Sequence, residues 1–299
     1  MGQIAFVFSG QGDQYPGMGR ELAEKYHAAA AVFERCDALR PGTSRQCFEG
    51  TEEELKETRN TQPCLFAVEL AAAAVLAETG VRPDAAAGFS LGEVAAATAV
   101  GLFDLETGFR LVCRRGELMQ REAERFDTSM AAVLKLDPEQ VQEACSRYPD
   151  IWPVNFNCPG QVTVSGLSSR MPELFADIKA AGGRAVPLKV KGAFHSPFMQ
   201  AAAADFAEEL AKAEIRKGTV TLYSDMTAEP YTENAAELLS GQVCRPVQWE
   251  KLIRNMIAEG ADTFVEIGPG KTLCGMIRRI DPGVTTYSVT EYLDEVEKC

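Results

Sequence analysis

A run of five apolar residues near the N-terminus limits the possible folds more than any other feature of the chain. Residues 4–8, Ile-Ala-Phe-Val-Phe, include no polar side chain, which is typical of a strand buried on both faces of a parallel sheet. A glycine-rich turn follows at residues 9–14, and a helix is predicted over residues 20–39. Because a strand buried on both faces needs helices on both sides of its sheet, we predict an α/β fold with a parallel sheet.

Residues 128–190 show a different pattern. Strands are predicted at 130–136, 152–156, 161–165 and 184–190, and helices at 137–147 and 172–181. The resulting order of strand, helix, strand, strand, helix, strand is the ferredoxin-like arrangement. We therefore predict a large domain formed by residues 1–127 and 191–299, with a small α+β subdomain inserted at 128–190.

The charge balance excludes one class of partner. The chain has 30 Lys and Arg against 43 Asp and Glu, a net charge of −13. Because neutralising phosphates needs clustered basic side chains, we expect no nucleic-acid partner. The longest apolar stretch, residues 64–77, is too short to span a bilayer and predicts a buried helix, so we also expect no membrane association.

The cysteines indicate a reduced protein without a metal. The chain has nine of them, scattered along its length, and no two form a C-x-x-C pair. Zinc ribbons, haem attachment and thioredoxin-type redox sites are therefore unsupported, and we expect neither a metal nor a cofactor. No basic segment precedes an apolar one at the N-terminus, which favours a cytoplasmic protein.

Residues 88–92, Gly-Phe-Ser-Leu-Gly, match the G-x-S-x-G pattern of a nucleophile elbow. In such an elbow the chain turns sharply from a strand into a helix, and the glycines let the two backbones pass closely. The alanines before it predict the strand, and residues 93–100 predict the helix. Ser90 would then present its hydroxyl at a helix N-terminus, where the dipole favours negative charge. The alternative is a serine with only a turn-forming role.

A serine hydroxyl needs a base to attack at neutral pH, and histidine is the usual one. The chain has only His27 and His195. His27 lies on a helix with a polar, surface-like pattern. His195 lies in a loop after the last strand of the predicted subdomain, so it is the expected base if Ser90 is the nucleophile. A hydrogen-bonded loop histidine is the alternative.

Seven motifs occur in one order along the chain. They are Gly-Gln-Gly-x-Gln, Gly-x-Ser-Leu-Gly-Glu, Arg-Gly, Asn-Phe-Asn-Cys-Pro-Gly-Gln, Phe-His-Ser, Pro-Val-Gln-Trp and Glu-Ile-Gly-Pro-Gly-Lys, which begin at residues 10, 88, 115, 155, 194, 246 and 266. In this order and spacing they resemble the malonyl-CoA:acyl carrier protein transacylases, the acyltransferases of bacterial fatty acid synthesis. The resemblance covers essentially the whole chain and implies an α/β-hydrolase-like core with a ferredoxin-like insertion.

The resemblance also implies roles for individual residues. Ser90 would attack the malonyl thioester, and His195 would take its proton and later return one to the leaving thiol. The backbone N–H groups of Gln11 and Leu91 would form the oxyanion hole. The backbone carbonyl of Gln248 would orient His195, in place of the carboxylate of a hydrolase triad.

Arg115 would bind the free carboxylate of the malonyl group as a two-pronged donor. The alternative is an ordinary surface ion pair with Glu117 or Glu122. Further positions match family residues that line the acyl, pantetheine or phosphate side of the site: Gln62, Asn157, Gln161 and Arg184. Arg184 has its own alternative, as part of a solvated strand face with Lys189 and Lys191.

Two phenylalanines bear on the acyl group. The family usually has histidine immediately before the nucleophile, whereas this chain has Phe89. Phe89 is either a neutral packing substitution or a change in acyl selectivity. Phe194, just before His195, favours malonyl, because in related polyketide acyltransferases a bulky residue there fills the space that an α-methyl group needs.

The leading interpretation is ping-pong transfer of malonyl from malonyl-CoA to the phosphopantetheine of acyl carrier protein, by a monomer without a cofactor. A polyketide-pathway acyltransferase with the same chemistry is the first alternative. A serine hydrolase is the second, although no acid between residues 90 and 195 lies in a recognisable motif; a non-catalytic scaffold is the third. Since CoA and carrier proteins are acidic, a local basic patch should guide them to this acidic chain, and we expect Arg184, Lys189 and Lys191 to form it.

Overall fold

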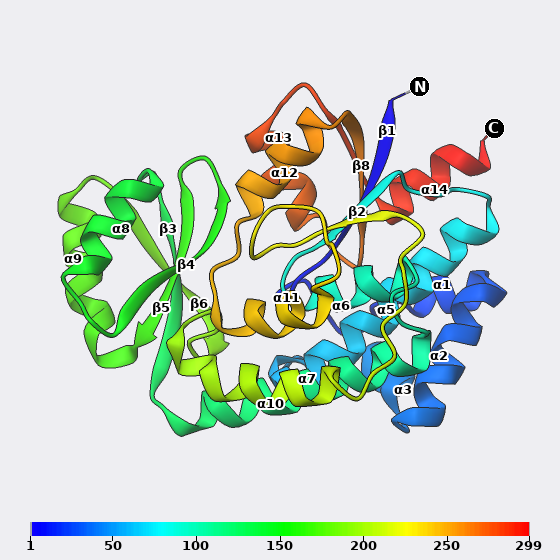
Figure 1. Ribbon diagram of the computed structural model, residues 1–299, viewed down its shortest axis with the longest axis horizontal. Coiled ribbons are helices and arrows are strands. Elements are labelled where there is room, and N and C mark those ends of the chain that lie inside the picture. Colours follow the sequence, from blue (N-terminus) through cyan, green and yellow to red (C-terminus); the bar gives the residue numbers. More distant parts are fainter. Residues whose placement is uncertain (1, 299) are drawn as a thin grey trace.

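The computed structural model describes residues 2–298 and contains two β-sheets (Figure 1). The larger sheet has five strands, all parallel, in the order β7-β2-β1-β8-β9. Their bounds are Thr221–Tyr223 for β7, Ala85–Gly88 for β2, Gln3–Phe8 for β1, Ala261–Ile267 for β8 and Thr285–Ser288 for β9. The predicted parallel α/β sheet is thus confirmed.

Strand β1 is buried on both faces, as its apolar run predicts. Phe6 and Phe8 belong to one core cluster, with residues of α5 (Thr58–Glu78), α6 (Leu91–Ala99) and α14 (Val289–Glu297). Ala5 and Val7 point to the opposite face, into a second cluster with α12 (Trp249–Ala258) and α13 (Thr272–Ile280). Successive residues of a strand point to opposite faces, so each face of the sheet receives alternate side chains and needs its own layer of helices.

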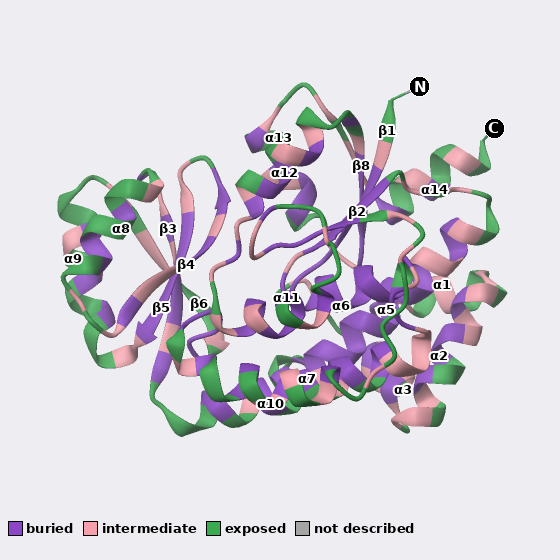
Figure 2. Ribbon diagram, in the orientation of Figure 1, coloured by how far each residue is buried: buried purple, intermediate pink, exposed green. Residues whose placement is uncertain are grey.

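The remaining helices outside residues 128–191 pack around α5 or around α10. They are α1 (Arg20–Lys25), α2 (His27–Leu39), α3 (Thr43–Glu49), α4 (Glu52–Lys56), α7 (Leu105–Arg125), α10 (Gln200–Leu210) and α11 (Ala235–Gly241). Helix α5 is apolar and long enough to cross a membrane, but 78% of its most apolar 18-residue segment is buried within the fold. Figure 2 shows it almost entirely buried, as predicted for residues 64–77.

The second sheet is antiparallel and has the order β4-β5-β3-β6. Its strands are β3 (Thr128–Leu134), β4 (Ile151–Cys158), β5 (Gln161–Leu167) and β6 (Arg184–Lys191), connected in part by α8 (Pro138–Ser146) and α9 (Met171–Ala180). Both helices cover the outer face of this sheet (Figure 1), where they enclose a separate core cluster. The ferredoxin-like order of elements is therefore present, whereas the exact domain boundaries stay a prediction.

Two predicted helices differ from the structure, and one strand was not predicted. The helix expected at 20–39 is interrupted at Tyr26, whose extended backbone ends α1 before α2 begins. The sequence predicts the next long helix from about Pro63 to Gly80, but α5 begins five residues earlier, at Thr58. Strand β9 was not predicted, because its sequence Thr-Thr-Tyr-Ser lies at a sheet edge and lacks an apolar run.

The site lies where the parallel strands end. Ser9 to Gln11 follow β1, Ser90 follows β2, and Asp225 comes two residues after β7. Because the carboxyl ends of parallel strands meet at one edge of the sheet, loops far apart in the sequence are brought together there.

Candidate active site

Ser90 occupies a sharp turn between β2 and α6. Its backbone lies at φ 56° and ψ −107°, a conformation that L-residues rarely adopt. The glycines on either side are required by space: a Cβ on Gly88 would lie 2.1 Å from the backbone nitrogen of Glu93, and one on Gly92 would lie 2.4 Å from the carbonyl oxygen of Phe8. The turn is the strand-to-helix elbow that the G-x-S-x-G pattern predicts.

His195 lies beside Ser90 and is almost completely buried. Its Nε2 is 2.8 Å from Ser90 Oγ, and its Nδ1 is 2.7 Å from the backbone carbonyl oxygen of Gln242. A carbonyl only accepts hydrogen bonds, so Nδ1 carries the proton and Nε2 is free to accept the one on Ser90. Burial, reinforced by the charge of Arg115, lowers the pKa of His195 to about 4, so the ring is neutral at physiological pH.

The carbonyl that orients His195 comes from Gln242, and the prediction of Gln248 was wrong. The Gln248 carbonyl accepts a hydrogen bond from the N–H of Leu252 at 2.9 Å, because Gln248 caps the start of α12. Gln242 begins a short 3₁₀ turn, Gln242–Cys244, and its carbonyl points to the imidazole instead. The sequence offers no way to choose between the two glutamines, since every residue has a backbone carbonyl.

Arg115 extends from α7 to the nucleophile and is only 1% exposed. Its Nη2 is 3.2 Å from Ser90 Oγ and also contacts the side-chain oxygen of Gln242, while Nη1 donates to Gln62 Oε1 at 2.9 Å. Burial lowers its pKa to about 10, so it remains a cation. Gln62, predicted to be near the acyl group, is buried and holds this guanidinium.

The surface ion pair considered as an alternative for Arg115 is absent from residues 2–298. Glu117 pairs with Arg114 at 3.1 Å, and Glu122 pairs with Arg121 and Arg125. Arg115 therefore has neutral hydrogen-bond partners, and its Nε has none in the described part of the chain. A buried cation without a paired carboxylate is a ready site for an anionic ligand.

The cavity next to Ser90 is small, about 80 Å³. Its walls include Gln11, Phe89 and Phe194, together with Leu188 and Val190 from β6. Phe89 packs edge-on against Trp249, with ring centroids 5.3 Å apart. Both phenylalanines that the sequence associated with the acyl group thus face this cavity.

The two backbone N–H groups predicted to form the oxyanion hole are free to bind a ligand. Within residues 2–298, neither the N–H of Gln11 nor that of Leu91 donates to a protein acceptor. Leu91 is the first residue of α6, where backbone donors have no partner inside the helix. The N–H of Ser90 is not available, because it donates to Asp225 Oδ2 at 2.7 Å.

The other predicted binding residues lie in different surroundings. Asn157 is buried behind the cavity wall, where its Nδ2 donates to Thr163 at 3.2 Å. Gln161 accepts a hydrogen bond from Arg279 at 2.7 Å and lies outside the cavity. Arg184 is exposed at the start of β6 and is also outside it. Asn155, which sequence analysis did not select, lines the cavity with Oδ1 unpaired.

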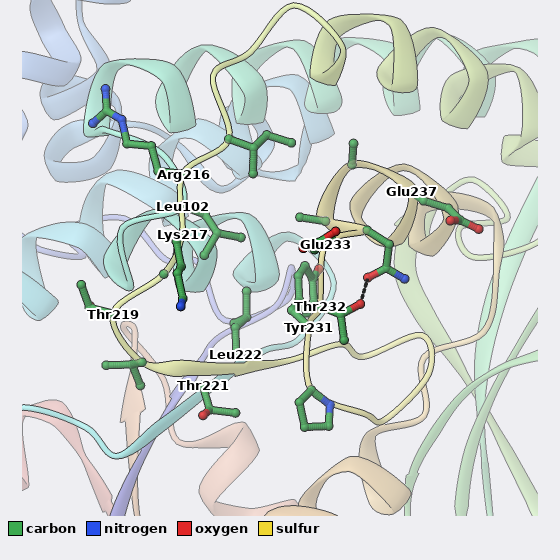
Figure 3. A pocket seen from close by; sticks show the side chains of 17 residues that line it. Leu102, Arg216, Lys217, Thr219, Thr221, Leu222, Tyr231, Thr232, Glu233 and Glu237 are labelled. Atoms are coloured by element: carbon green, nitrogen blue, oxygen red, sulfur yellow. Dashed lines mark hydrogen bonds between the residues drawn. The ribbon is translucent and has the colours of Figure 1, made fainter.

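A wider opening adjoins this cavity and shares Gln11, Leu188 and Val190 with it. Lys56 and Lys189 line this opening, whereas Lys191 does not. A larger groove of about 1140 Å³ lies elsewhere, between residues 215–222 and 230–237 (Figure 3). It contains neither Ser90 nor His195, so its size does not locate the chemistry.

The geometry thus joins a buried candidate nucleophile, a neutral base and a buried cation, and comparison with known proteins agrees. A family model described as an acyl transferase domain matches residues 5–283. The chain belongs to the acyl transferase family. A backbone carbonyl takes the place of a carboxylate beside His195 in this acyltransferase, which distinguishes it from a Ser-His-Asp hydrolase.

Named relatives cover nearly the whole acyltransferase. The malonyl CoA-acyl carrier protein transacylase of Bacillus subtilis (strain 168) is 37% identical over 97% of this chain and 94% of its own length. The crystal structure of the malonyl CoA-acyl carrier protein transacylase from Clostridium perfringens is 35% identical, with a TM-score of 0.94 over 99% of this chain and 98% of that one. A malonyl-transacylase in complex with its type II PKS acyl-carrier protein is 31% identical, with a TM-score of 0.95 over 99% of this chain and 100% of that one.

Proposed function

We propose that this protein transfers a malonyl group from malonyl-CoA to the phosphopantetheine thiol of an acyl carrier protein, in fatty acid synthesis. The observation that carries the proposal is Arg115, a buried cation 3.2 Å from the nucleophilic oxygen with no carboxylate paired to it in the described chain. An acyl group ending in a free carboxylate supplies that missing charge. The small cavity fits a short acyl group.

In the first half-reaction, Ser90 Oγ attacks the thioester carbonyl carbon while its proton moves to Nε2 of His195. The negative charge that develops on the carbonyl oxygen is stabilised by the N–H groups of Gln11 and Leu91. The C–S bond then breaks, and His195 returns the proton to the CoA sulfur. The products are free CoA and malonyl-Ser90.

In the second half-reaction, the pantetheine thiol of the carrier protein gives its proton to His195 and attacks the ester carbonyl. The C–O bond to Ser90 breaks, and the serine oxygen recovers its proton from His195. The Gln242 carbonyl keeps the imidazole in the required tautomer throughout. The reaction balances without a metal or cofactor, and we place it in a cytoplasmic monomer.

The test is the intact mass of the protein after brief exposure to malonyl-CoA. We expect one malonyl adduct on the wild-type chain and none on Ser90→Ala, with the adduct lost on addition of a carrier protein bearing phosphopantetheine. An unmodified wild-type chain would refute the mechanism. Adduct loss to water at an equal rate without the carrier protein would instead favour a hydrolase.

A polyketide pathway is the second candidate, because one solved relative is complexed with a carrier protein of that kind. Comparing transfer rates to fatty-acid-type and polyketide-type carrier proteins decides between the two pathways.

A further inference from the structure

Two carboxyl groups are buried behind the nucleophile. Glu93 lies in the first turn of α6 and Asp225 lies after β7, and both are completely inaccessible to solvent. They are neighbours, because the Asp225 N–H donates to Glu93 Oε1 at 3.2 Å. Neither forms an ion pair with Lys or Arg in residues 2–298. The mechanism above uses neither of them.

A hydrogen bond between two carboxyl groups requires a proton, because two ionised carboxylates are both acceptors. Glu93 already accepts from the hydroxyl of Tyr231 at 2.7 Å, from Gln242 Nε2 at 2.7 Å and from the Asp225 N–H at 3.2 Å. Asp225 accepts from the Ser90 N–H through Oδ2, whereas its buried Oδ1 meets no donor. Oδ1 is thus the Asp225 oxygen left to carry a proton for a bond to Glu93.

We propose that Asp225 is a positioning residue that shares one proton with Glu93. This pair holds Ser90, His195 and Arg115 in their relative positions. The pair then carries one negative charge, with Glu93 ionised. The kinetic part of this inference rests on the proposed function; the shared proton does not.

The first effect is on the nucleophile itself. Ser90 has a strained backbone, and the bond from its N–H to Asp225 at 2.7 Å is made in that strained conformation. A strained backbone persists only where surrounding contacts over-determine it. The same bond removes the Ser90 N–H from the oxyanion hole and leaves that task to other donors.

The second effect passes through Gln242. Its Nε2 donates to Glu93 and, at 2.8 Å, to the carbonyl of Ser90, while its Oε1 accepts from Arg115. Its backbone carbonyl accepts from His195. An ionised Glu93 can only accept, so it determines which end of the amide faces Arg115.

The groups that face the pair carry one positive charge between them. They are Arg115 from α7, His195 and Ser90 from the catalytic loops, and Tyr231, whose ring lines the large groove in Figure 3. Arg115 carries one positive charge, His195 is neutral, and burial with the Glu93 charge raises the pKa of Tyr231 so that it stays neutral. A second ionisation of the pair would place two negative charges beside the cation meant for the substrate.

The shared proton predicts a pH-dependent stability. Burial and the neighbouring Glu93 charge raise the pKa of Asp225 above 3.8, so the folded chain keeps a proton that the unfolded chain loses above that pH. Stability from this group is complete below pH 3.8 and is lost as pH rises through the folded pKa. Asp225→Asn removes the titration but keeps both bonds, since its amide oxygen accepts from Ser90 and its NH₂ donates to Glu93.

The first experiment measures melting temperatures of wild type and Asp225→Asn between pH 4.5 and 9 at constant ionic strength. We expect a melting-temperature gap in favour of the variant that is smallest at pH 4.5 and grows by several degrees toward higher pH. The matched control is Asp294→Asn, an exposed residue of α14, whose curve should run parallel to wild type. Parallel curves for Asp225→Asn would overturn the shared proton.

The second experiment measures the rate of single-turnover malonylation. We expect Asp225→Ala to lower the rate by about 10²-fold with little change in substrate KM, because displaced reacting groups cost rate. Asp225→Asn should restore it to within several-fold of wild type. A normal rate in the alanine variant, or equal losses in both variants, would overturn positioning. A wild-type chain that is never malonylated would refute the proposed function, and the melting curves would still decide on the proton.

Discussion

Replacement of Arg115 by alanine tests the proposed substrate most directly. The guanidinium is 1% exposed and bonds to Ser90, Gln62 and Gln242, so its charge is largely removed from solvent. Leaving one partner of a buried ion pair uncompensated costs about 3–5 kcal/mol. At 1.36 kcal/mol per factor of ten, kcat/KM for malonyl-CoA should fall by about 10²–10⁴-fold.

Acetyl-CoA separates this effect from general damage to the site. Acetyl-CoA has no free carboxylate, so its transfer depends on Arg115 only through the position of the serine. We expect its kcat/KM to fall by no more than about tenfold. The assay is release of free CoA thiol from each substrate, expressed as the malonyl-to-acetyl ratio of kcat/KM.

The control is Arg114→Ala, the next residue on the same helix, which is exposed and pairs with Glu117. We expect its ratio to equal that of wild type. Equal losses for malonyl-CoA and acetyl-CoA in Arg115→Ala would refute carboxylate binding by this arginine.

Three further predictions concern the base, the acyl cavity and the opening. Since burial lowers the pKa of His195 to about 4, the malonylation rate should stay constant from pH 8 to about 5 and fall only below that, as the ring becomes protonated; a midpoint near the ordinary value of about 6.5 would contradict the burial argument. Phe89→His should change the preference among acyl-CoAs of different size, because Phe89 lines the cavity and packs on Trp249; an unchanged preference across an acyl-CoA panel would make Phe89 a neutral packing residue. Lys189→Ala should lower kcat/KM for malonyl-CoA by a few-fold at low salt and by less at high salt, because exposed charges are screened; a salt-independent loss would exclude electrostatic guidance.

The sequence predicted those parts of the fold that depend on a local pattern of residues. The apolar run at residues 4–8 predicted β1, because a strand without polar side chains needs burial on both faces. The order of elements at 128–190 predicted the second sheet. Strand β9 could not be predicted, because it is short and polar and its place at the sheet edge depends on pairing with β8.

Part of the site could also be predicted from the sequence. Glycines at 88 and 92 permit a backbone approach that no other residue allows, so they identified the turn around Ser90. With only two histidines, elimination selected His195. These conclusions depend on residue type and local spacing, which the sequence displays directly.

Other parts of the site depend on groups that the sequence cannot distinguish. Gln242 and Gln248 are six residues apart and chemically identical, and only the helix start at Trp249 decides which carbonyl remains free. Asn155 lines the cavity and Gln161 does not, because Asn155 lies within β4 and Gln161 lies at the start of β5, where it contacts Arg279.

The sequence by itself determined the class of fold and selected Ser90 and His195 as the candidate nucleophile and base, because glycine, histidine and apolar runs have narrow local uses. Tertiary structure alone decided which carbonyl orients the base, that Arg115 is a buried cation rather than a surface ion pair, and that Glu93 and Asp225 meet 132 residues apart. The physical reason is burial: removal from water changes the pKa of a group and makes each unpaired charge costly, and burial is a property of the packed molecule rather than of any residue.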